Sequence, residues 1–154
     1  MVTVFFLSVF FVLYSYAVYP LCLKMLPAKH RITASTPNSW PTISLIITAH
    51  NEASRIAEKL DNSLAIDYPK DKLHIIVASD CSSDSTDEIV NTYANKGIQL
   101  VRADQHLGKE YAQYCAIQNS SGEIIVFSDV ATDIPADAIT TLARYFTDQI
   151  VGAV

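Results

Sequence analysis

SDCSSDST, residues 79–86, is the stretch that decides the fold. It follows an Ile- and Val-rich apolar run, Leu73 to Ala78, and it precedes a helical pattern from Asp84 to Ala94. A strand, a polar turn and a helix in this order are one step of an open α/β fold. Ligands of such folds bind at the carboxyl edge of the sheet, so the turn is the first candidate for a ligand site.

The turn combines structural residues with one that is better explained by function. Ser85 and Glu88 have the spacing of a capping box, which begins a helix. Ser83 and Asp84 are common helix starters and are predicted to be mainly structural as well. Asp80 ends the strand and stands too early to cap the helix. Its carboxylate is therefore predicted to accept hydrogen bonds from the N–H or hydroxyl groups of a ligand.

The alternation of strands and helices extends on both sides of this turn. The predicted strands are residues 43–49, 73–79, 98–101 and 123–129, with a fifth at 150–154, and the predicted helices are residues 53–66, 84–94, 109–119 and 135–146. The first strand is almost continuously apolar, as is typical of a strand buried on both faces. The pattern predicts a parallel, doubly wound α/β sheet with right-handed crossovers.

Three acidic residues stand at the carboxyl ends of predicted strands: Glu52, Asp80 and Asp129. Because these ends share one edge of a parallel sheet, the three are expected to converge on one cleft. Like charges repel, so a cation or the N–H groups of a ligand would be their partner. Asp129 is the best candidate ligand for a hard divalent metal, which prefers oxygen and commonly bridges to substrate phosphates. Asp133 is predicted mainly to start the next helix.

One basic residue is a candidate phosphate contact. Lys109 follows Gly108 at the start of a predicted helix, where backbone N–H groups favour anions. The surrounding pattern is not a Walker loop, because Ala103 and Glu110 replace residues that such a loop requires, and no GxGxxG motif follows the first strand. His50 could also touch a ligand, although a single loop histidine is more often solvated.

The composition narrows the function classes. The chain has 154 residues, enough for one domain, and its net charge of −5 without a Lys/Arg cluster argues against a nucleic-acid partner. Its three cysteines form no CxxC pair, which favours free thiols in a reducing compartment. Its four histidines are scattered and show no metal-binding spacing.

Residues 1–26 are predicted to form a transmembrane helix. Residues 1–23 carry no charge and span roughly 30 Å as a helix, enough for the hydrocarbon core. A cleaved signal peptide is the alternative, but it would carry a basic start and a small-residue cleavage site. Lys24, Lys29 and Arg31 follow the span, which predicts a cytoplasmic soluble domain anchored in the inner or plasma membrane. Residues 27–41 are then a Pro-rich linker, and residues 42–154 are the α/β domain.

Together these landmarks resemble glycosyltransferase family 2, whose members have the GT-A fold. Residues 42–52, TISLIITAHNE, resemble the family's opening strand and its Pro-Ala-Tyr-Asn-Glu motif. Four further motifs match in order and with the family spacing: DYP at 67–69, DCSSDST at 80–86, GK at 108–109 and FSD at 127–129. The N-terminal helix is similar to the anchor of membrane-bound members that build polysaccharides or glycolipids. The resemblance implies a Rossmann-like, parallel-sheet sandwich that binds a nucleotide-diphospho-sugar.

The resemblance also implies roles for individual residues. Ala49, Glu52 and Asp80 would hold the uridine of a UDP-sugar donor, with Asp80 on the uracil. Lys109 would lie near the base or the diphosphate, and Asp129 would coordinate Mg²⁺ or Mn²⁺. The sugar would pass to a polysaccharide or lipid-linked acceptor by direct attack of a hydroxyl on the anomeric carbon, with inversion.

The sequence departs from the family at identifiable positions. Ala131 stands where the family has a second metal-binding residue, so coordination by one carboxylate is implied. Cys81 replaces a glycine of the central turn. The family's catalytic base is expected beyond Val154, so the chain would be a truncated, donor-binding half that is inactive alone. Two alternatives stay open, a non-catalytic nucleotide-binding membrane protein or remnant and a nucleotidyltransferase.

Overall fold

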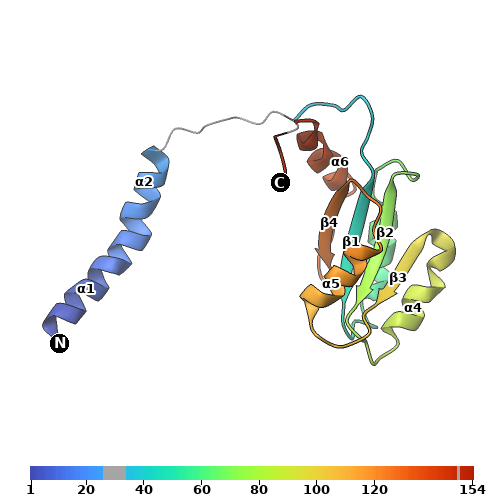
Figure 1. Cartoon of the computed structure of the whole chain (residues 1–154), viewed down its shortest axis with the longest axis horizontal. Coiled ribbons are helices and arrows are strands. Elements are labelled where there is room, and N and C mark those ends of the chain that lie inside the picture. Colours follow the sequence, from blue (N-terminus) through green and yellow to red (C-terminus); the bar gives the residue numbers. More distant parts are fainter. Residues whose placement is uncertain (26–33, 149) are drawn as a thin grey trace. The chain divides into compact units, whose positions relative to one another are not determined.

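The structure is a computed structural model that describes residues 1–25, 34–148 and 150–154. The chain divides into two compact units, residues 1–33 and 34–154. Figure 1 shows residues 2–25 of the first as a helical rod and the second as a sheet with helices. Each unit is described by itself.

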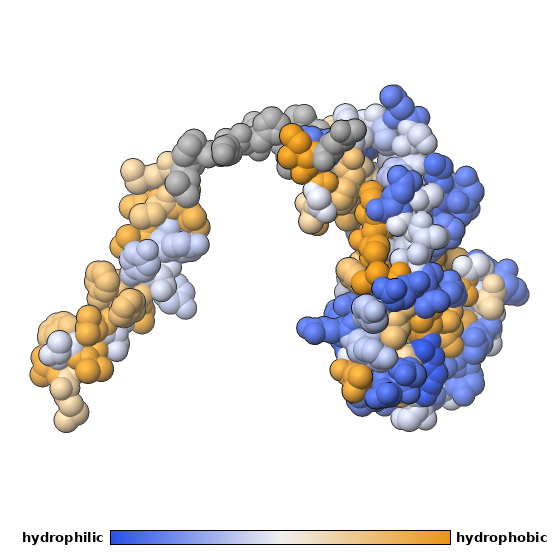
Figure 2. Space-filling view, viewed as in Figure 1, coloured by the Kyte–Doolittle hydropathy of each residue, from blue (hydrophilic) through white to orange (hydrophobic). Residues whose placement is uncertain are grey.

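The N-terminal unit contains a continuous 24-residue helix, Val2–Met25, that is long and apolar enough to cross a membrane. It consists of α1 (Val2–Leu13), a π-helical turn (Tyr14–Val18) and α2 (Tyr19–Met25). Figure 2 shows that mostly apolar side chains cover it. The π-helical turn ends two residues before Pro20 and contains Tyr16, four residues before that proline. In a regular α-helix the proline ring clashes with the carbonyl four residues earlier, so a wider turn here relieves that clash.

The second unit is built on a four-stranded parallel sheet, which confirms the predicted fold class. Its strands are β1 (Ile43–Ala49), β2 (Leu73–Ser79), β3 (Ile98–Arg102) and β4 (Ile124–Asp129). They lie in the order β3-β2-β1-β4, and every neighbouring pair is parallel. The central strand β1 is almost completely buried, as its continuous apolar run predicts.

Helices cover both faces of this sheet (Figure 1). They are α3 (Ile56–Leu64), α4 (Thr86–Thr92), α5 (Lys109–Gln118) and α6 (Ala138–Ala143), with 3₁₀ turns at Ala94–Lys96 and Arg144–Thr147. Leu45 and Ile47 of β1 join the core beneath α3, α4 and α6, whereas Ile46 packs with Ala112 and Ala116 of α5. Because successive side chains of β1 point to opposite faces of the sheet, they pack into two separate cores.

The predicted capping box is wrong. Helix α4 begins at Thr86, and the side chain of Ser85 makes no capping hydrogen bond within the described unit. Asp84 takes that role, because its Oδ1 accepts a hydrogen bond from the backbone N–H of Thr86 at 3.0 Å. At the other end, Gly97 adopts a left-handed conformation with φ of 88°, as expected of a glycine that ends a helical segment.

The predicted fifth strand is also wrong. Residues 150–154 are fully described, and they do not pair as a strand. The backbone N–H of Val151 donates to the Asp148 carbonyl at 3.0 Å, and that of Ile150 donates to Asp148 Oδ1 at 3.0 Å. These two N–H groups are therefore bonded locally and are not available to extend the sheet.

Candidate functional site

Asp80 is held at the carboxyl edge of the sheet by backbone contacts with β1. Ala49 and Ser79, the last residues of β1 and β2, are in register, and the next N–H, that of Asp80, donates to the Ala49 carbonyl at 3.0 Å. Asp80 is 3% exposed, and its Oδ1 accepts a hydrogen bond from the Gly108 N–H at 3.2 Å. The residue predicted to contact a ligand is therefore a buried carboxylate at the sheet edge.

The turns after β1 and β2 are joined to each other. Asn51 Oδ1 accepts a hydrogen bond from the Ser83 N–H at 2.8 Å, and the Asn51 N–H donates to Ser82 Oγ at 3.2 Å. Asn51 and Cys81 both have positive φ angles, of 54° and 52°. Non-glycine residues rarely adopt this conformation, which explains why a glycine would suit position 81. Cys81 is held there by a contact from its Sγ to the Ala103 carbonyl at 3.1 Å.

Asp84 has a structural role, as predicted. Besides capping α4, its Oδ2 accepts a hydrogen bond from the Ala53 N–H at 3.1 Å. The hydrogen bond from the Thr86 side chain lowers the pKa of Asp84 below its usual value. The buried Thr86 hydroxyl in turn accepts a hydrogen bond from the Glu52 N–H at 2.8 Å. These contacts fix the backbone of the turn that carries Glu52.

The start of α5 connects the carboxyl ends of β2 and β4. Gly108, with φ of 95°, donates its N–H to Asp80, and the next residue, Lys109, places its Nζ 2.6 Å from Asp129 Oδ1. The Lys109–Asp129 pair is exposed on both sides, so its net contribution to stability is small. Glu52 is not part of this connection: its carboxylate pairs with Arg55 at 3.1 Å. Of the three acids expected to converge on one cleft, Asp80 and Asp129 are connected through the start of α5, whereas Glu52 is not.

Lys59 is a buried cation that the sequence analysis missed. It lies on α3 and is 2% exposed, with its Nζ donating to Ser128 Oγ at 2.8 Å and to the Thr132 carbonyl. Burial lowers the pKa of Lys59, while the nearby Asp133 and Asp129 act in the opposite direction. A signal was present, because the buried positions of α3 include Ile56, Lys59, Leu60 and Ser63, the spacing of one helix face.

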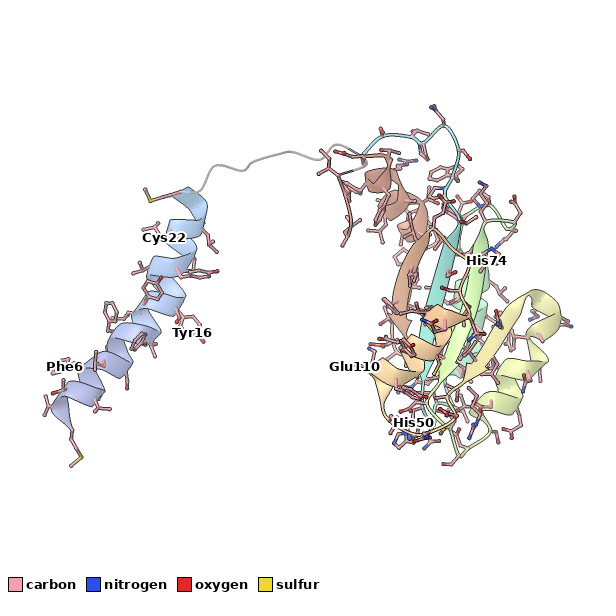
Figure 3. The ribbon with its side chains drawn as sticks, viewed as in Figure 1. Phe6, Tyr16, Cys22, His50, His74 and Glu110 are labelled. Carbon is pink, nitrogen blue, oxygen red and sulfur yellow. The ribbon has the colours of Figure 1, made fainter. Side chains whose placement is uncertain are left out.

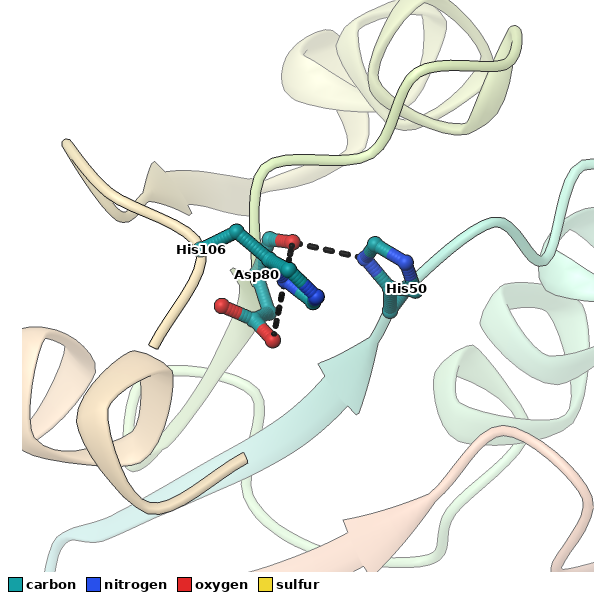
Figure 4. A group of neighbouring side chains, drawn as sticks. All are labelled: His50, Asp80 and His106. Atoms are coloured by element: carbon teal, nitrogen blue, oxygen red, sulfur yellow. Dashed lines mark hydrogen bonds and ion pairs between the residues drawn. The ribbon is translucent and has the colours of Figure 1, made fainter. Parts of the chain in front are cut away.

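Two histidines meet at Asp80, which corrects the expectation that the histidines are scattered (Figure 4). His50 Nδ1 lies 2.6 Å from the Asp80 carbonyl oxygen, and His106 Nδ1 lies 2.9 Å from Asp80 Oδ2. The two rings are stacked, with centroids 4.4 Å apart. One ligand atom from each residue lies within 4.8 Å of the others, an arrangement that suits a divalent metal. Sequence spacing could not reveal it, because 56 positions in the chain separate the two histidines.

Comparison with known proteins gives a consistent family assignment. Residues 44–154 match the family model described as glycosyl transferase family 2. An N-acetylglucosaminyltransferase of Rhizobium sp. (strain N33) is 31% identical over 140 residues, which cover 89% of this chain and 31% of that protein. The probable glycosyltransferase YdaM of Bacillus subtilis is 34% identical over 120 residues, covering 74% of this chain and 29% of that protein. The chain thus spans about a third of the length of the curated relatives it matches.

Solved structures agree with this assignment. The mannosyltransferase PcManGT of Pyrobaculum calidifontis, in complex with GDP-Man and Mn²⁺, matches with a TM-score of 0.78 and 31% identity, over 88% of this chain and 41% of that one. TarS of S. aureus, residues 1–349 in complex with UDP-GlcNAc, matches with a TM-score of 0.60 and 27% identity, over 64% of this chain and 29% of that one.

Proposed function

This chain belongs to glycosyl transferase family 2, and we propose that its α/β unit binds the nucleotide-sugar donor of a membrane-anchored, inverting glycosyltransferase. The observation that carries the proposal is the connection through the start of α5. Asp80 contacts Gly108, and the neighbouring Lys109 contacts Asp129, so a buried carboxylate and an exposed acid–base pair lie along one edge of the sheet. Such an edge is where α/β folds bind nucleotides.

Each residue of this edge has a proposed role. Asp80 accepts a hydrogen bond from an N–H of the base, as a buried carboxylate with a fixed orientation can. Ala49 and Glu52 hold the nucleoside, and Lys109 contacts the diphosphate, whose charge it complements. The donor is a UDP-sugar. The two solved neighbours carry UDP-GlcNAc in one case and GDP-Man in the other, so guanine is the base to test against uracil.

Asp129 fits the role of metal ligand. Its carboxylate is about half exposed at the end of β4, and oxygen ligands of this kind suit Mg²⁺ or Mn²⁺. Lys109 already neutralises part of its charge, so Lys109 Nζ must move aside from Oδ1 or share the site with the ion. When bound, the metal supplies positive charge that stabilises the leaving diphosphate.

The proposal also includes a membrane anchor and a sugar acceptor. The helix Val2–Met25 anchors the protein, and the basic residues that follow it favour a cytoplasmic α/β unit. The acceptor is a glycan or a lipid-linked glycan, whose hydroxyl attacks the anomeric carbon directly. A nucleic-acid partner is not proposed, given the net charge of −5.

Calorimetric titration of the full chain in detergent with UDP and GDP, with and without Mg²⁺, tests donor binding. Asp80→Ala should abolish UDP binding. Asp80→Asn should keep the contact with Gly108 but still weaken UDP strongly, because an amide is not a charged acceptor. Asp71→Ala, an exposed acid before β2, is the matched control and should bind UDP normally. Unchanged UDP affinity in both Asp80 variants, or none in the wild type, would refute the proposal.

A second candidate, nucleotide binding without sugar transfer, is favoured by one observation. Ala131 follows Asp129 where a second carboxylate would strengthen a metal site, and Lys109 already pairs with the acid that is present. Measuring UDP-sugar hydrolysis beside UDP binding separates the candidates. Metal-dependent release of UDP supports a transferase, whereas binding without any turnover supports the second candidate.

A further inference from the structure

Three neighbouring strands each deliver one metal-ligating side chain to the same point. His50 directly follows β1, Asp80 directly follows β2, and His106 lies in the loop after β3. Because the strands are parallel and the ends of β1 and β2 are in register, the positions of His50 and Asp80 are fixed by the sheet itself. The loop that carries His106 is fixed separately, by the contacts of Gly108 and of the Ala103 carbonyl.

The polar atoms of these residues face one another (Figure 4). Nδ1 of each imidazole points to Asp80: that of His50 lies 2.6 Å from the carbonyl oxygen, and that of His106 lies 2.9 Å from Oδ2 and 3.2 Å from the carbonyl oxygen. Asp80 Oδ1 is engaged by Gly108, which leaves Oδ2 as the carboxylate oxygen next to the His106 imidazole, whereas the His50 imidazole contacts the Asp80 carbonyl oxygen. The hydrogen bond from the Gly108 N–H would thus orient the Asp80 carboxylate as a metal ligand, as contacts around metal ligands commonly do.

We propose that His50, Asp80 and His106 form a binding site for a transition-metal ion such as Zn²⁺, separate from Asp129, and that an ion bound there excludes the nucleobase. Two imidazoles and a carboxylate are the ligand set that zinc accepts, with water in the fourth position, whereas Mg²⁺ prefers oxygen alone. The second half of the proposal rests on the proposed function, because it uses Asp80 as the residue that recognises the base.

The geometry requires a modest closure of the site. Tetrahedral zinc with ligand bonds of about 2.0–2.1 Å holds its ligand atoms about 3.4 Å apart. The three ligand atoms here lie within 4.8 Å of one another, and both histidines are exposed, so their rings have room to turn. His50 Nε2 lies 3.2 Å from Asn51 Nδ2, so His50 carries its proton on Nδ1. Metal binding at Nδ1 therefore moves that proton to Nε2 and breaks the contact with the Asn51 amide.

Mutual exclusion follows from the position of the ion. It would lie on the Oδ2 side of Asp80, next to the Nδ1 atoms of the two imidazoles and outside the sheet edge. The proposed hydrogen bond from the base uses the same carboxylate, whose other oxygen is already taken by Gly108. The ion and its water ligand would fill the space outside Oδ2 in which the base would have to lie, so a bound ion would lower the affinity for the nucleoside and a bound nucleoside would lower the affinity for the ion.

The metal half is tested by titrating the full chain in detergent with Zn²⁺ and Co²⁺, following heat and the visible absorption of Co²⁺. Figure 3 shows that His74, on β2, the strand that Asp80 follows, lies at the opposite end of the sheet from His50, so His74→Gln is the matched control. His106→Gln should weaken Zn²⁺ by at least about 10-fold, whereas His74→Gln should not change it. Equal Zn²⁺ affinity in the wild type and His106→Gln, or no binding by the wild type, would overturn the proposal. Circular dichroism of both variants checks that each is folded.

The exclusion half uses uridine and guanosine, which lack the phosphates that would themselves chelate Zn²⁺. A saturating nucleoside should reduce the apparent Zn²⁺ affinity of the wild type, and undiminished affinity would refute exclusion. Failure of the two ideas is distinguishable. If Zn²⁺ binds but no nucleotide does, the metal site stands and the proposed function falls. If UDP binds but Zn²⁺ does not, the metal site falls alone.

Discussion

Replacing Lys59 with Met tests the contacts that join α3 to the end of β4 and to the loop after it. Lys59 is 2% exposed, and its Nζ donates to Ser128 Oγ at 2.8 Å and to the Thr132 carbonyl. A hydrogen bond from a charged donor contributes about 1.5–3 kcal/mol, so losing both would cost about 3–6 kcal/mol. Removing a buried ammonium group offsets part of that loss. We therefore expect Lys59→Met to lower the free energy of unfolding by roughly 2–4 kcal/mol.

Urea denaturation of the full chain in detergent measures this change. Trp40, the single tryptophan, packs edge-on against Tyr68 with centroids 5.6 Å apart, so its fluorescence reports on the α/β unit. Lys96→Met is the control, because Lys96 is half exposed and lies 3.8 Å from Asp61. It should cost less than about 1 kcal/mol. If Lys59→Met is no more destabilising than Lys96→Met, the assignment of Lys59 as a structural cation is wrong.

Three other substitutions test separate parts of the structure. Asp129→Asn keeps the size of the side chain but removes its charge, so it should abolish the Mg²⁺-dependent part of UDP binding, and an unchanged response to EDTA would contradict this. Burial raises the pKa of Tyr68 to about 12, and its hydroxyl donates to the Pro41 carbonyl at 2.7 Å. The contribution of the neutral Tyr68 hydroxyl to stability is therefore complete below pH 10.0 and is lost as the pH rises through about 12. Urea titrations at high pH should accordingly show that the free energy of unfolding of Tyr68→Phe falls less steeply than that of the wild type. The pKa of Asp84 is lowered from 3.8 by its hydrogen bond with Thr86, so that contribution is present above pH 3.8 and lost as the pH falls through the lowered value. Asp84→Asn should flatten the acid limb of the stability profile, and a limb as steep as that of the wild type would exclude this role.

The sheet was predictable because its signals are local. Each strand is a short apolar run that ends in a polar turn, and the bounds of β2 and the start of β3 agree with the prediction. The continuous apolarity of residues 43–49 predicted a strand buried on both faces, and β1 is central and buried. Asp84 was also predictable, since a short acid before a helix is a common cap. Local patterns predicted the last helix as far as residue 146 and a strand at 150–154, whereas α6 ends at Ala143, a 3₁₀ turn follows at Arg144–Thr147, and residues 150–154 form no strand.

The candidate site was less predictable because its contacts join distant residues. Asp80 stood out through its position at a strand end, but nothing in the spacing of the chain paired it with His106. Lys59 was not predicted to be buried because a lysine on a helix normally faces water. Its burial depends on acceptors from distant residues, Ser128 on β4 and Thr132 in the loop after it. Cys81 looks like an ordinary small residue in the sequence, whereas its φ of 52° shows that the turn demands a conformation typical of glycine.

One carboxylate links the proposed donor site and the proposed metal site. Asp80 is fixed by the register of β1 and β2, and Gly108 occupies one of its oxygens, so the direction of the other is set before any ligand arrives. A nucleobase N–H and a metal ion both require that oxygen, but they need different surroundings. The ion needs the imidazoles of His50 and His106 as ligands, whereas the base needs the two imidazoles to leave Oδ2 accessible. His106→Gln should therefore weaken Zn²⁺ while leaving UDP affinity unchanged or raised, because it removes one of the two rings that close over Asp80. A parallel loss of both affinities would instead mean that His106 maintains the loop before α5, and the two sites would then share a scaffold rather than compete.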